Sequence, residues 1–295
     1  MKKWAIIVST YGNSRFRLTK TIESIVNGTK MPYDLWVRGA SEDYWQQCQQ
    51  REVAIQFNAK FMESARWRHW ELSNSVKTVE NPMIAFVKDD IIFPEGWLEA
   101  IDYFWENNPQ IPLASVGPAF IEAWELLNIG YIKDLDGLWN KKIDIGRLEL
   151  NEIAQKKGVK FHSGFTSVKP FPSIGTCPFA YTIKRKDFFD WNGAYYAGPG
   201  DTTAVYGYLG LLHGKFSIYL SRPTAIHRVG RSSTEWWEYH KNEHEKTKEL
   251  IWWSETLGRG FKARWGMTWE EFHKIAEKKF NEEFVKYDFS KLRYL

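Results

Sequence analysis

The sequence predicts an α/β protein: a mostly parallel (mixed) sheet flanked by helices, with a C-terminal helical appendage. Two observations lead to this fold class. In the first half of the chain, short apolar runs typical of strands alternate with segments whose apolar residues recur at helical spacing. One of these runs, 84–87, is followed closely by the acidic pair Asp89-Asp90. Ligands of open α/β sheets bind at the carboxyl ends of strands, so this pair predicts a functional edge of the sheet.

The elements of the first half can be assigned in chain order. Leu18, Ile22 and Ile25 share one helix face, and Pro94 and Gly96 open a helix after the acidic pair. We expect strands at 4–9, 33–37, 53–57 and 84–87, and helices at 18–26, 64–79 and 97–105.

The second half is less regular but still alternates. We expect strands at 179–183, 216–220 and 224–227, helices at 145–157, 202–213, 235–255 and 269–285, and a loop at 163–178. The helix at 202–213 should stop at Gly214. The segment 233–295 has too little apolar surface to fold independently. We therefore expect one domain at 1–232, with 233–295 packed on it as a helical extension.

The composition of the chain limits the classes of protein to which it can belong. The chain has 295 residues, which suits one large domain, and a net charge of +4, short of what a dedicated nucleic-acid binder shows. Its two cysteines, Cys48 and Cys177, exclude a cysteine-rich zinc site and fit a reducing compartment. The first apolar run ends by Thr10, too early for a signal peptide. With no apolar run of membrane-spanning length either, we expect no stable membrane insertion and a cytoplasmic location.

Aromatic residues make up 17% of the chain and include 16 tryptophans, many of which should be core. Aromatic faces also stack on sugars and bases, so a polar ring-shaped ligand is plausible.

Five features follow one another along the chain. The first strand ends in Thr10-Tyr11-Gly12-Asn13, and Asn74 precedes the central strand. The acidic pair is followed by Pro94-Glu95-Gly96-Trp97-Leu98-Glu99. Later, Gly200-Asp201 enters a helix, and a strand ends in His227 with Arg228 and Arg231 beyond it.

This order resembles the GT-A fold glycosyltransferases, especially the large inverting family typified by polysaccharide synthases. The resemblance spans roughly residues 4 to 231. It implies a nucleoside-diphosphate sugar as donor, with a UDP-sugar favoured, and Mn²⁺ or Mg²⁺ as cofactor. It also implies Asp90 and His227 as metal ligands and Asp201 as catalytic base. Donor contacts would come from Thr10, Tyr11, Asn13, Asn74, Asp89, Arg228 and Arg231.

The chain departs from the family pattern in three places. A strict Asp-x-Asp is absent, so either Asp89 or Asp90 could take the metal-binding position. Gly200 stands where the family has a glutamate, and Arg38 begins the Arg-Gly-Ala that replaces the usual acid after the second strand.

Each candidate also has an ordinary structural role. Asp201 would serve well as an N-cap, and His227 as a hydrogen-bonded histidine. Arg228 and Arg231 could clamp phosphates or remain solvated loop charges.

The acceptor is expected to be a hydroxyl of a glycan or glycoconjugate. Modified DNA is an alternative acceptor, because the chain is basic and aromatic. A non-catalytic carbohydrate- or nucleic-acid-binding protein on a transferase scaffold is a second alternative. A nucleotidyltransferase fits less well, because 9–17 contains a single glycine where a triphosphate loop needs several.

Overall fold

The computed structural model describes residues 2–11, 15–40, 44–64, 75–134, 147–158, 169–174, 180–191, 202–227, 262 and 266–295. Its strands are β1 Trp4–Tyr11, β2 Tyr33–Ala40, β3 Lys60–Ser64, β4 Met83–Lys88, β5 Ile91–Ile92, β6 Leu113–Glu122, β7 Phe171–Ser173, β8 Ala180–Lys184 and β9 Phe216–His227. Its helices are α1 Arg15–Gly28, α2 Tyr44–Gln56, α4 Trp97–Asn107, α5 Ala123–Asn128, α6 Arg147–Lys156, α7 Arg185–Asp190, α8 Thr202–Leu212 and α11 Trp269–Phe284.

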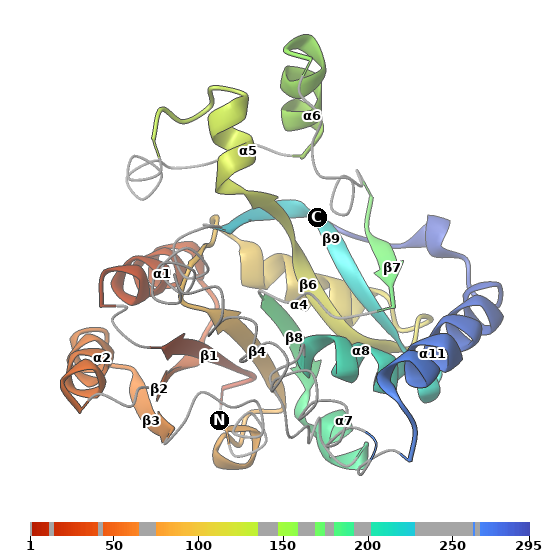
Figure 1. Ribbon diagram of the computed structural model, residues 1–295, viewed down its shortest axis with the longest axis horizontal. Coiled ribbons are helices and arrows are strands. Elements are labelled where there is room, and N and C mark those ends of the chain that lie inside the picture. The colour runs from red at the N-terminus through yellow and green to blue at the C-terminus, as the bar shows by residue number, and fades with distance from the viewer. Residues whose placement is uncertain are drawn as a thin grey trace, which may run out of the picture.

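In the described part of the chain the strands form one mixed sheet in the order β3-β2-β1-β4-β8-β6-β9-β5, with β7 also paired to β9 (Figure 1). β1 runs parallel to β2 and β4, and β6 runs parallel to β9. β8 lies antiparallel between β4 and β6. The predicted fold class, a mostly parallel but mixed sheet flanked by helices, is confirmed.

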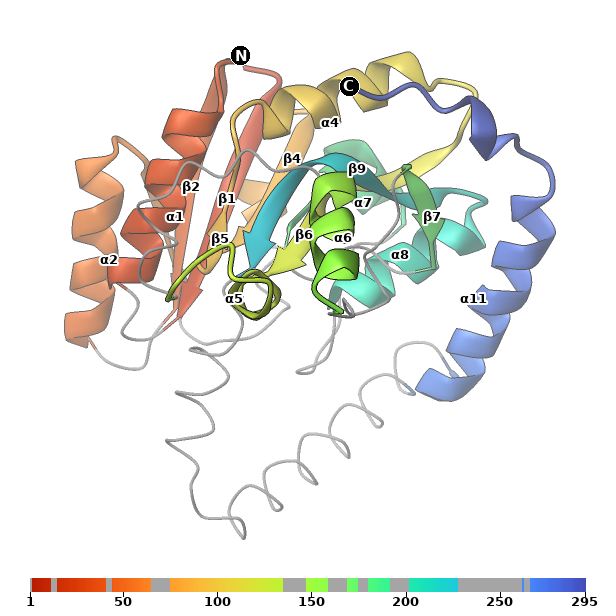
Figure 2. The ribbon, with the colours of Figure 1, turned by 90° about the horizontal axis from the view of Figure 1, so that it is seen from above.

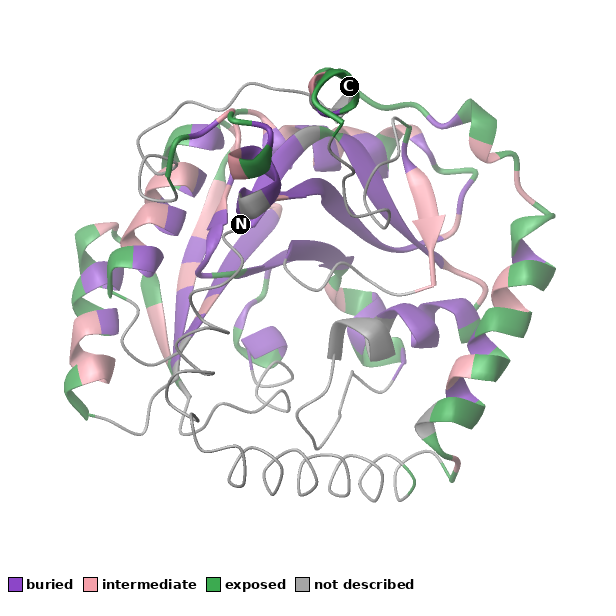
Figure 3. Ribbon diagram, turned by 45° about the horizontal axis from the view of Figure 1, so that its top comes forward, coloured by how far each residue is buried: buried purple, intermediate pink, exposed green. Residues whose placement is uncertain are grey.

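The core lies in and around this sheet. The five residues 4–8 of β1 are all fully buried, as a strand covered on both faces requires. Figure 3 shows the same pattern across the sheet, where buried strands stand against helices that are exposed on their outer sides.

The segment between β5 and α4 is held against the end of α1. The Gly96 N–H donates to the Gly28 carbonyl oxygen over 2.8 Å, just before α4 begins. A Cβ on Gly28 would lie 2.8 Å from the Pro94 carbonyl oxygen, so only glycine allows this approach. The segment that joins β5 to α4 is thus fixed against the end of α1.

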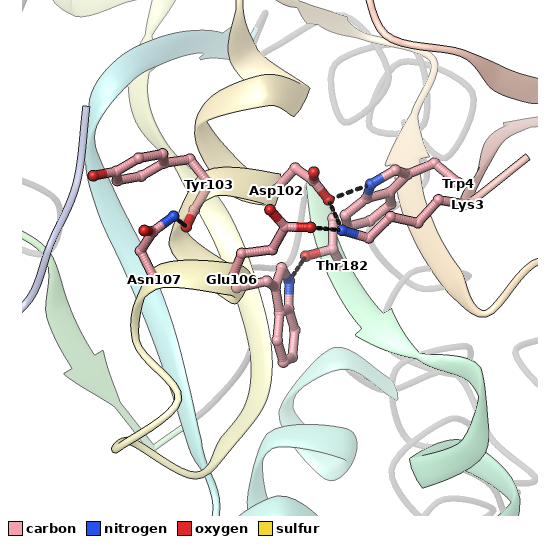
Figure 4. Close-up of polar contacts among 8 residues, drawn as sticks. Lys3, Trp4, Asp102, Tyr103, Glu106, Asn107 and Thr182 are labelled. Atoms are coloured by element: carbon pink, nitrogen blue, oxygen red, sulfur yellow. Dashed lines mark hydrogen bonds and ion pairs between the residues drawn. The ribbon is translucent and has the colours of Figure 1, made fainter.

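α4 is tied to the opposite, amino-terminal end of the central strands (Figure 4). The Trp4 indole donates to Asp102 over 2.7 Å, and Lys3 donates to Glu106 over 2.6 Å. The Trp105 indole donates to Thr182 on β8. These polar contacts hold α4 across the start of β1, which is the end away from the acidic pair, and the middle of β8.

The C-terminal helix α11 packs on α8, at the end of the molecule far from α1 and α2 (Figure 2). Tyr208 of α8 meets Phe272 of α11 edge-on, with ring centroids 5.8 Å apart. Further on, Asn108 and Arg293 exchange two hydrogen bonds of 2.8 Å, which fasten the C-terminal segment to the end of α4. The boundary at 232/233 stays a prediction.

Several predicted elements need correction. The strand expected at 53–57 is wrong, because Val53 and Ala54 form the buried side of α2 while Ile55 is 71% exposed, a helical rather than an alternating pattern. The two short strands expected at 216–220 and 224–227 are one strand, β9. The expected loop at 163–178 contains the short strand β7. Of the helix expected at 64–79, Ser64 instead ends β3, and most of the rest lies outside the described residues, as does 235–255.

Among the helices that the structure describes, none has both the length and the apolar character that crossing a bilayer requires.

Candidate functional site

Three strand ends meet where the central strands finish. β5 pairs antiparallel with the end of β9, and Ile91 lies opposite His227. β6 pairs parallel with the same stretch of β9, and Glu122 lies opposite His227. Strand register therefore brings together Asp90, Glu122 and His227, which are far apart in sequence.

The His227 imidazole lies between two carboxylates. Its Nε2 is 3.3 Å from Asp90 Oδ2, and its Nδ1 is 2.9 Å from Glu122 Oε2. All three side chains are largely buried, with exposed fractions of 5% for Asp90, 9% for His227 and 14% for Glu122. A histidine held on both sides in this way has one defined ring orientation.

The pKa values of this group reflect mutual stabilisation. Burial opposes charge on the Asp90 carboxyl, but the hydrogen bond and the charge of His227 outweigh it, so the pKa of Asp90 is lowered. Burial likewise opposes protonation of His227, but Asp90 and then Glu122 outweigh it and raise the pKa of the imidazole. Each group thus favours the charged form of its neighbour.

The other acidic residue of the pair, Asp89, faces different partners. The Thr10 hydroxyl donates to Asp89 Oδ2 over 2.7 Å in a buried contact. Arg17, in the first turn of α1, places Nη2 3.9 Å from the same oxygen, and its side chain is 10% exposed. Asp89 therefore joins the ends of β1 and α1, while Asp90 joins the ends of β5 and β9.

The donor set at Asp90 and His227 suits a hard divalent cation. Two ligands at about 2.1 Å on adjacent octahedral positions lie about 3 Å apart, close to the observed 3.3 Å between Nε2 and Oδ2. Two buried carboxylates, Asp90 and Glu122, flank the imidazole, and the buried guanidinium of Arg17 lies beside the neighbouring Asp89. Among the described residues no three ligating side chains converge to enclose a metal, so the pair is an open, two-donor arrangement.

The structure brings together Thr10, Asp89, Asp90 and His227 of the predicted site residues. Tyr11 ends β1, where its backbone pairs with Ala40 of β2. The remaining predicted site residues lie outside the described residues: Asn13, Asn74, Asp201, Arg228 and Arg231.

Two residues of this cluster were not anticipated from the sequence. Arg17 is one of many basic residues, and nothing in the sequence separates it from the others. Glu122 carries a usable signal, because it ends the apolar run 113–121 just as Asp89 follows the run 84–87. That run contains Gly117-Pro118. Proline cannot donate a hydrogen bond to a neighbouring strand, so its presence argues against assigning a strand from the sequence. In the structure the ladder shifts register between Gly117 and Ala119.

A sheet of this order, with paired acids after its central strand, has the GT-A fold. Comparison with solved structures agrees. A mannosyltransferase from Pyrobaculum calidifontis, solved with GDP-mannose and Mn²⁺, superposes with a TM-score of 0.54 at 12% identity, over 95% of this chain and 69% of that one. GalNAc-T7, solved with UDP, GalNAc and Mn²⁺, superposes with a TM-score of 0.53 at 13% identity, over 77% of this chain. This chain spans 44% of the length of GalNAc-T7.

At these identities the likeness defines the fold. Comparisons with protein-family profiles and with curated protein sequences give no match.

Proposed function

We propose that this protein transfers a sugar from a nucleoside-diphosphate sugar to a hydroxyl group of a glycan or glycoconjugate, with inversion at the sugar. The observation that carries the proposal is the buried Asp90–His227 pair, which lies at the ligand-binding edge of a GT-A sheet. Both neighbours described above were solved with Mn²⁺ and with a nucleotide or nucleotide sugar, which supports the same class of donor here.

Asp90 and His227 would hold Mn²⁺ or Mg²⁺, which when bound neutralises charge on the departing diphosphate. Asp89 already contacts Thr10 and Arg17. It would therefore organise this edge of the sheet rather than bind the metal. Arg228 and Arg231 directly follow β9, so they would contact the donor phosphates. Thr10, Tyr11, Asn13 and Asn74 would contribute the remaining donor contacts.

The chemical step is a direct displacement. The acceptor oxygen forms a bond to the anomeric carbon while the bond from that carbon to the diphosphate oxygen breaks. The acceptor proton passes to the Asp201 carboxylate, which lies one residue before α8. The diphosphate leaves with the bonding electron pair.

Nucleotide binding with and without the cation tests this proposal. UDP and GDP should bind the wild-type protein in the presence of Mn²⁺ and at least about 10-fold more weakly after chelation, since the phosphates lose their positive partner. Asp90→Ala should bind weakly in both conditions. Isothermal titration calorimetry measures both affinities.

Glu106→Gln is the matched control, because it removes a carboxylate from the opposite end of the sheet and should keep the Mn²⁺ effect. If the nucleotide affinity stays the same after chelation and in Asp90→Ala, the metal assignment is refuted. Tight nucleotide binding without hydrolysis or transfer of any sugar nucleotide would instead favour the non-catalytic binding protein.

A further inference from the structure

The role of Glu122 follows from what a carboxylate can do to an imidazole. An ionised carboxylate only accepts hydrogen bonds, and a neutral imidazole carries its single proton on one nitrogen. Glu122 Oε2 lies 2.9 Å from Nδ1 of His227, so the proton belongs on Nδ1. Nε2 then presents its lone pair toward Asp90.

This tautomer determines what the contact between Nε2 of His227 and Asp90 can do. In the neutral imidazole two acceptors, a ring-nitrogen lone pair and a carboxylate oxygen, face one another across 3.3 Å. Such a pair needs something positive between its members, either a proton on Nε2, which gives the hydrogen bond to Asp90 described above, or a metal cation in the place of that proton. We propose that Glu122 is a positioning residue, which holds His227 as the Nδ1–H tautomer so that Nε2 and Asp90 together bind a divalent cation. This inference rests on the proposed function and extends it to a residue outside the metal's own ligands.

The surroundings of Glu122 fit this role. Its register opposite His227 in the β6–β9 ladder places the two side chains on the same side of the sheet. α5 begins at the next residue, and the Glu122 N–H donates to Glu125 Oε2 over 3.1 Å. Strand pairing and the helix start thus fix the backbone of Glu122 from both sides. Hydrogen-bonded carboxylates behind ligating histidines commonly raise metal affinity in this way.

A plain structural role makes a different prediction. β6 and β9 already pair through their backbones along most of their length, so the Glu122–His227 contact is not needed to join them. If Glu122 only stabilised the fold, its removal would lower the melting temperature and leave cation binding by the folded protein unchanged.

The test compares Mn²⁺ affinity in four variants, read from the electron paramagnetic resonance signal of free Mn²⁺. Glu122→Leu should weaken Mn²⁺ binding about 10- to 100-fold. Glu122→Gln should recover most of that loss, because its amide oxygen still accepts from Nδ1–H. Asp90→Asn and His227→Gln should weaken binding at least as much as Glu122→Leu.

The matched control is Glu125→Ala. It removes the other member of the contact at the start of α5 and leaves the carboxylate beside His227 in place. Its Mn²⁺ affinity should stay within about 3-fold of wild type. An equal loss in Glu125→Ala and Glu122→Leu would assign the effect to α5 and overturn the inference.

A second readout reports the tautomer itself. In ¹⁵N-histidine-labelled protein with Mg²⁺, the His227 signals, identified by their loss in His227→Gln, should show the proton on Nδ1. In Glu122→Leu they should show a mixture of tautomers. If Glu122→Leu leaves both the Mn²⁺ affinity and the His227 tautomer unchanged, the proposed role of Glu122 is refuted, while the metal site of the proposed function is not. Unchanged affinity in Asp90→Asn and His227→Gln as well would refute the metal site of the proposed function.

Discussion

Two adjacent aspartates at the end of β4 have different partners in the structure. Asp89 accepts from Thr10 and approaches Arg17, whereas Asp90 meets His227. Adjacent side chains in a tight turn point in different directions, and here one direction leads to α1 and the other to β9. The sequence alone leaves the two aspartates equivalent, because Thr10 lies 79 positions upstream of Asp89 and His227 lies at the end of β9.

The first prediction at the residue scale concerns Asp201, whose proposed role is catalytic base. Asp201→Asn should lower turnover by about 10² to 10⁴ while donor affinity stays nearly unchanged, because asparagine cannot take the acceptor proton. Steady-state rates with the sugar nucleotide, beside calorimetric donor binding, measure both quantities.

The alternative role for Asp201 is a cap on α8. Asparagine also caps well, so a purely structural Asp201 would make Asp201→Asn as active as wild type, with a stability change of about 1 kcal/mol or less. A stable and fully active variant would contradict the catalytic role.

At the scale of elements, the strands that form continuous apolar runs were predictable, whereas the functional role of the edge at Asp89 and Asp90 stays a prediction. β1, β4 and β8 were anticipated because each is a short apolar run bounded by polar residues, and α4 because its apolar positions recur every three to four residues. β6 was missed because Gly117-Pro118 interrupts it. Glu122 was missed with it.

α2 shows why local pattern alone fails. Its segment 53–57 carries β-branched residues and suggests a strand, but the buried side of α2 is set by its packing on β2 and β3. Pairing across the chain, as in β5 with β9, depends on register and has no local signature.

An element-scale prediction concerns Asn81, which joins the start of β4 to β1 and β2. Its buried amide donates to the carbonyl oxygens of Lys2 and Trp4 and to Asp34 Oδ2. Asn81→Ala should lower the free energy of unfolding by about 1–3 kcal/mol, because two strand carbonyls and a carboxylate lose their donor. Asn107→Ala is the matched control and should cost less, since that amide makes one hydrogen bond within α4.

The loss in Asn81→Ala should also depend on pH. Burial alone would raise the pKa of Asp34, but the Asn81 hydrogen bond and the Lys2 charge outweigh it and lower the pKa below its ordinary 3.8. A lowered pKa in the folded protein adds stability above the unfolded value, and this stability is lost as pH falls through the folded value. Urea unfolding should therefore show a larger gap between wild type and Asn81→Ala at pH 6 than at pH 2. A gap that widens toward pH 2 would contradict this account.

At the scale of the whole molecule, the sheet and the C-terminal helix form one packed body. Phe216 of β9 meets the rings of Phe280, Tyr287 and Phe289 edge-on, so the end of the chain adds aromatic residues to the core. Residues 266–295 of the C-terminal extension are therefore packed on the sheet. Its tryptophan-rich stretch lies outside the described residues.

The prediction at this scale concerns the acceptor, and it uses Trp252 and Trp253 of that stretch. If the acceptor is a glycan, replacing both with alanine should impair transfer with little sensitivity to salt and little change in melting temperature. If the acceptor is DNA, gel-shift binding should weaken steeply with salt, and the double variant should lose about 1–3 kcal/mol for each stacked base.

We expect the glycan outcome, because a net charge of +4 is short of what a dedicated nucleic-acid binder shows. A DNA shift that persists at physiological ionic strength would contradict that expectation. A double variant that aggregates or melts early would show instead that the two tryptophans are part of the core.

The parallel pairing of β6 with β9 has a consequence for how the molecule folds. Glu122 and His227 are 105 positions apart, and the Asn108–Arg293 contact joins residues 185 positions apart. Contacts of such long range form late and slow the folding of a chain. During synthesis Asp89 and Asp90 leave the ribosome long before His227, so a partly made chain carries the acids without the imidazole. The Asp90–His227 pair can therefore form only after β9 has joined the sheet beside β6 and β5.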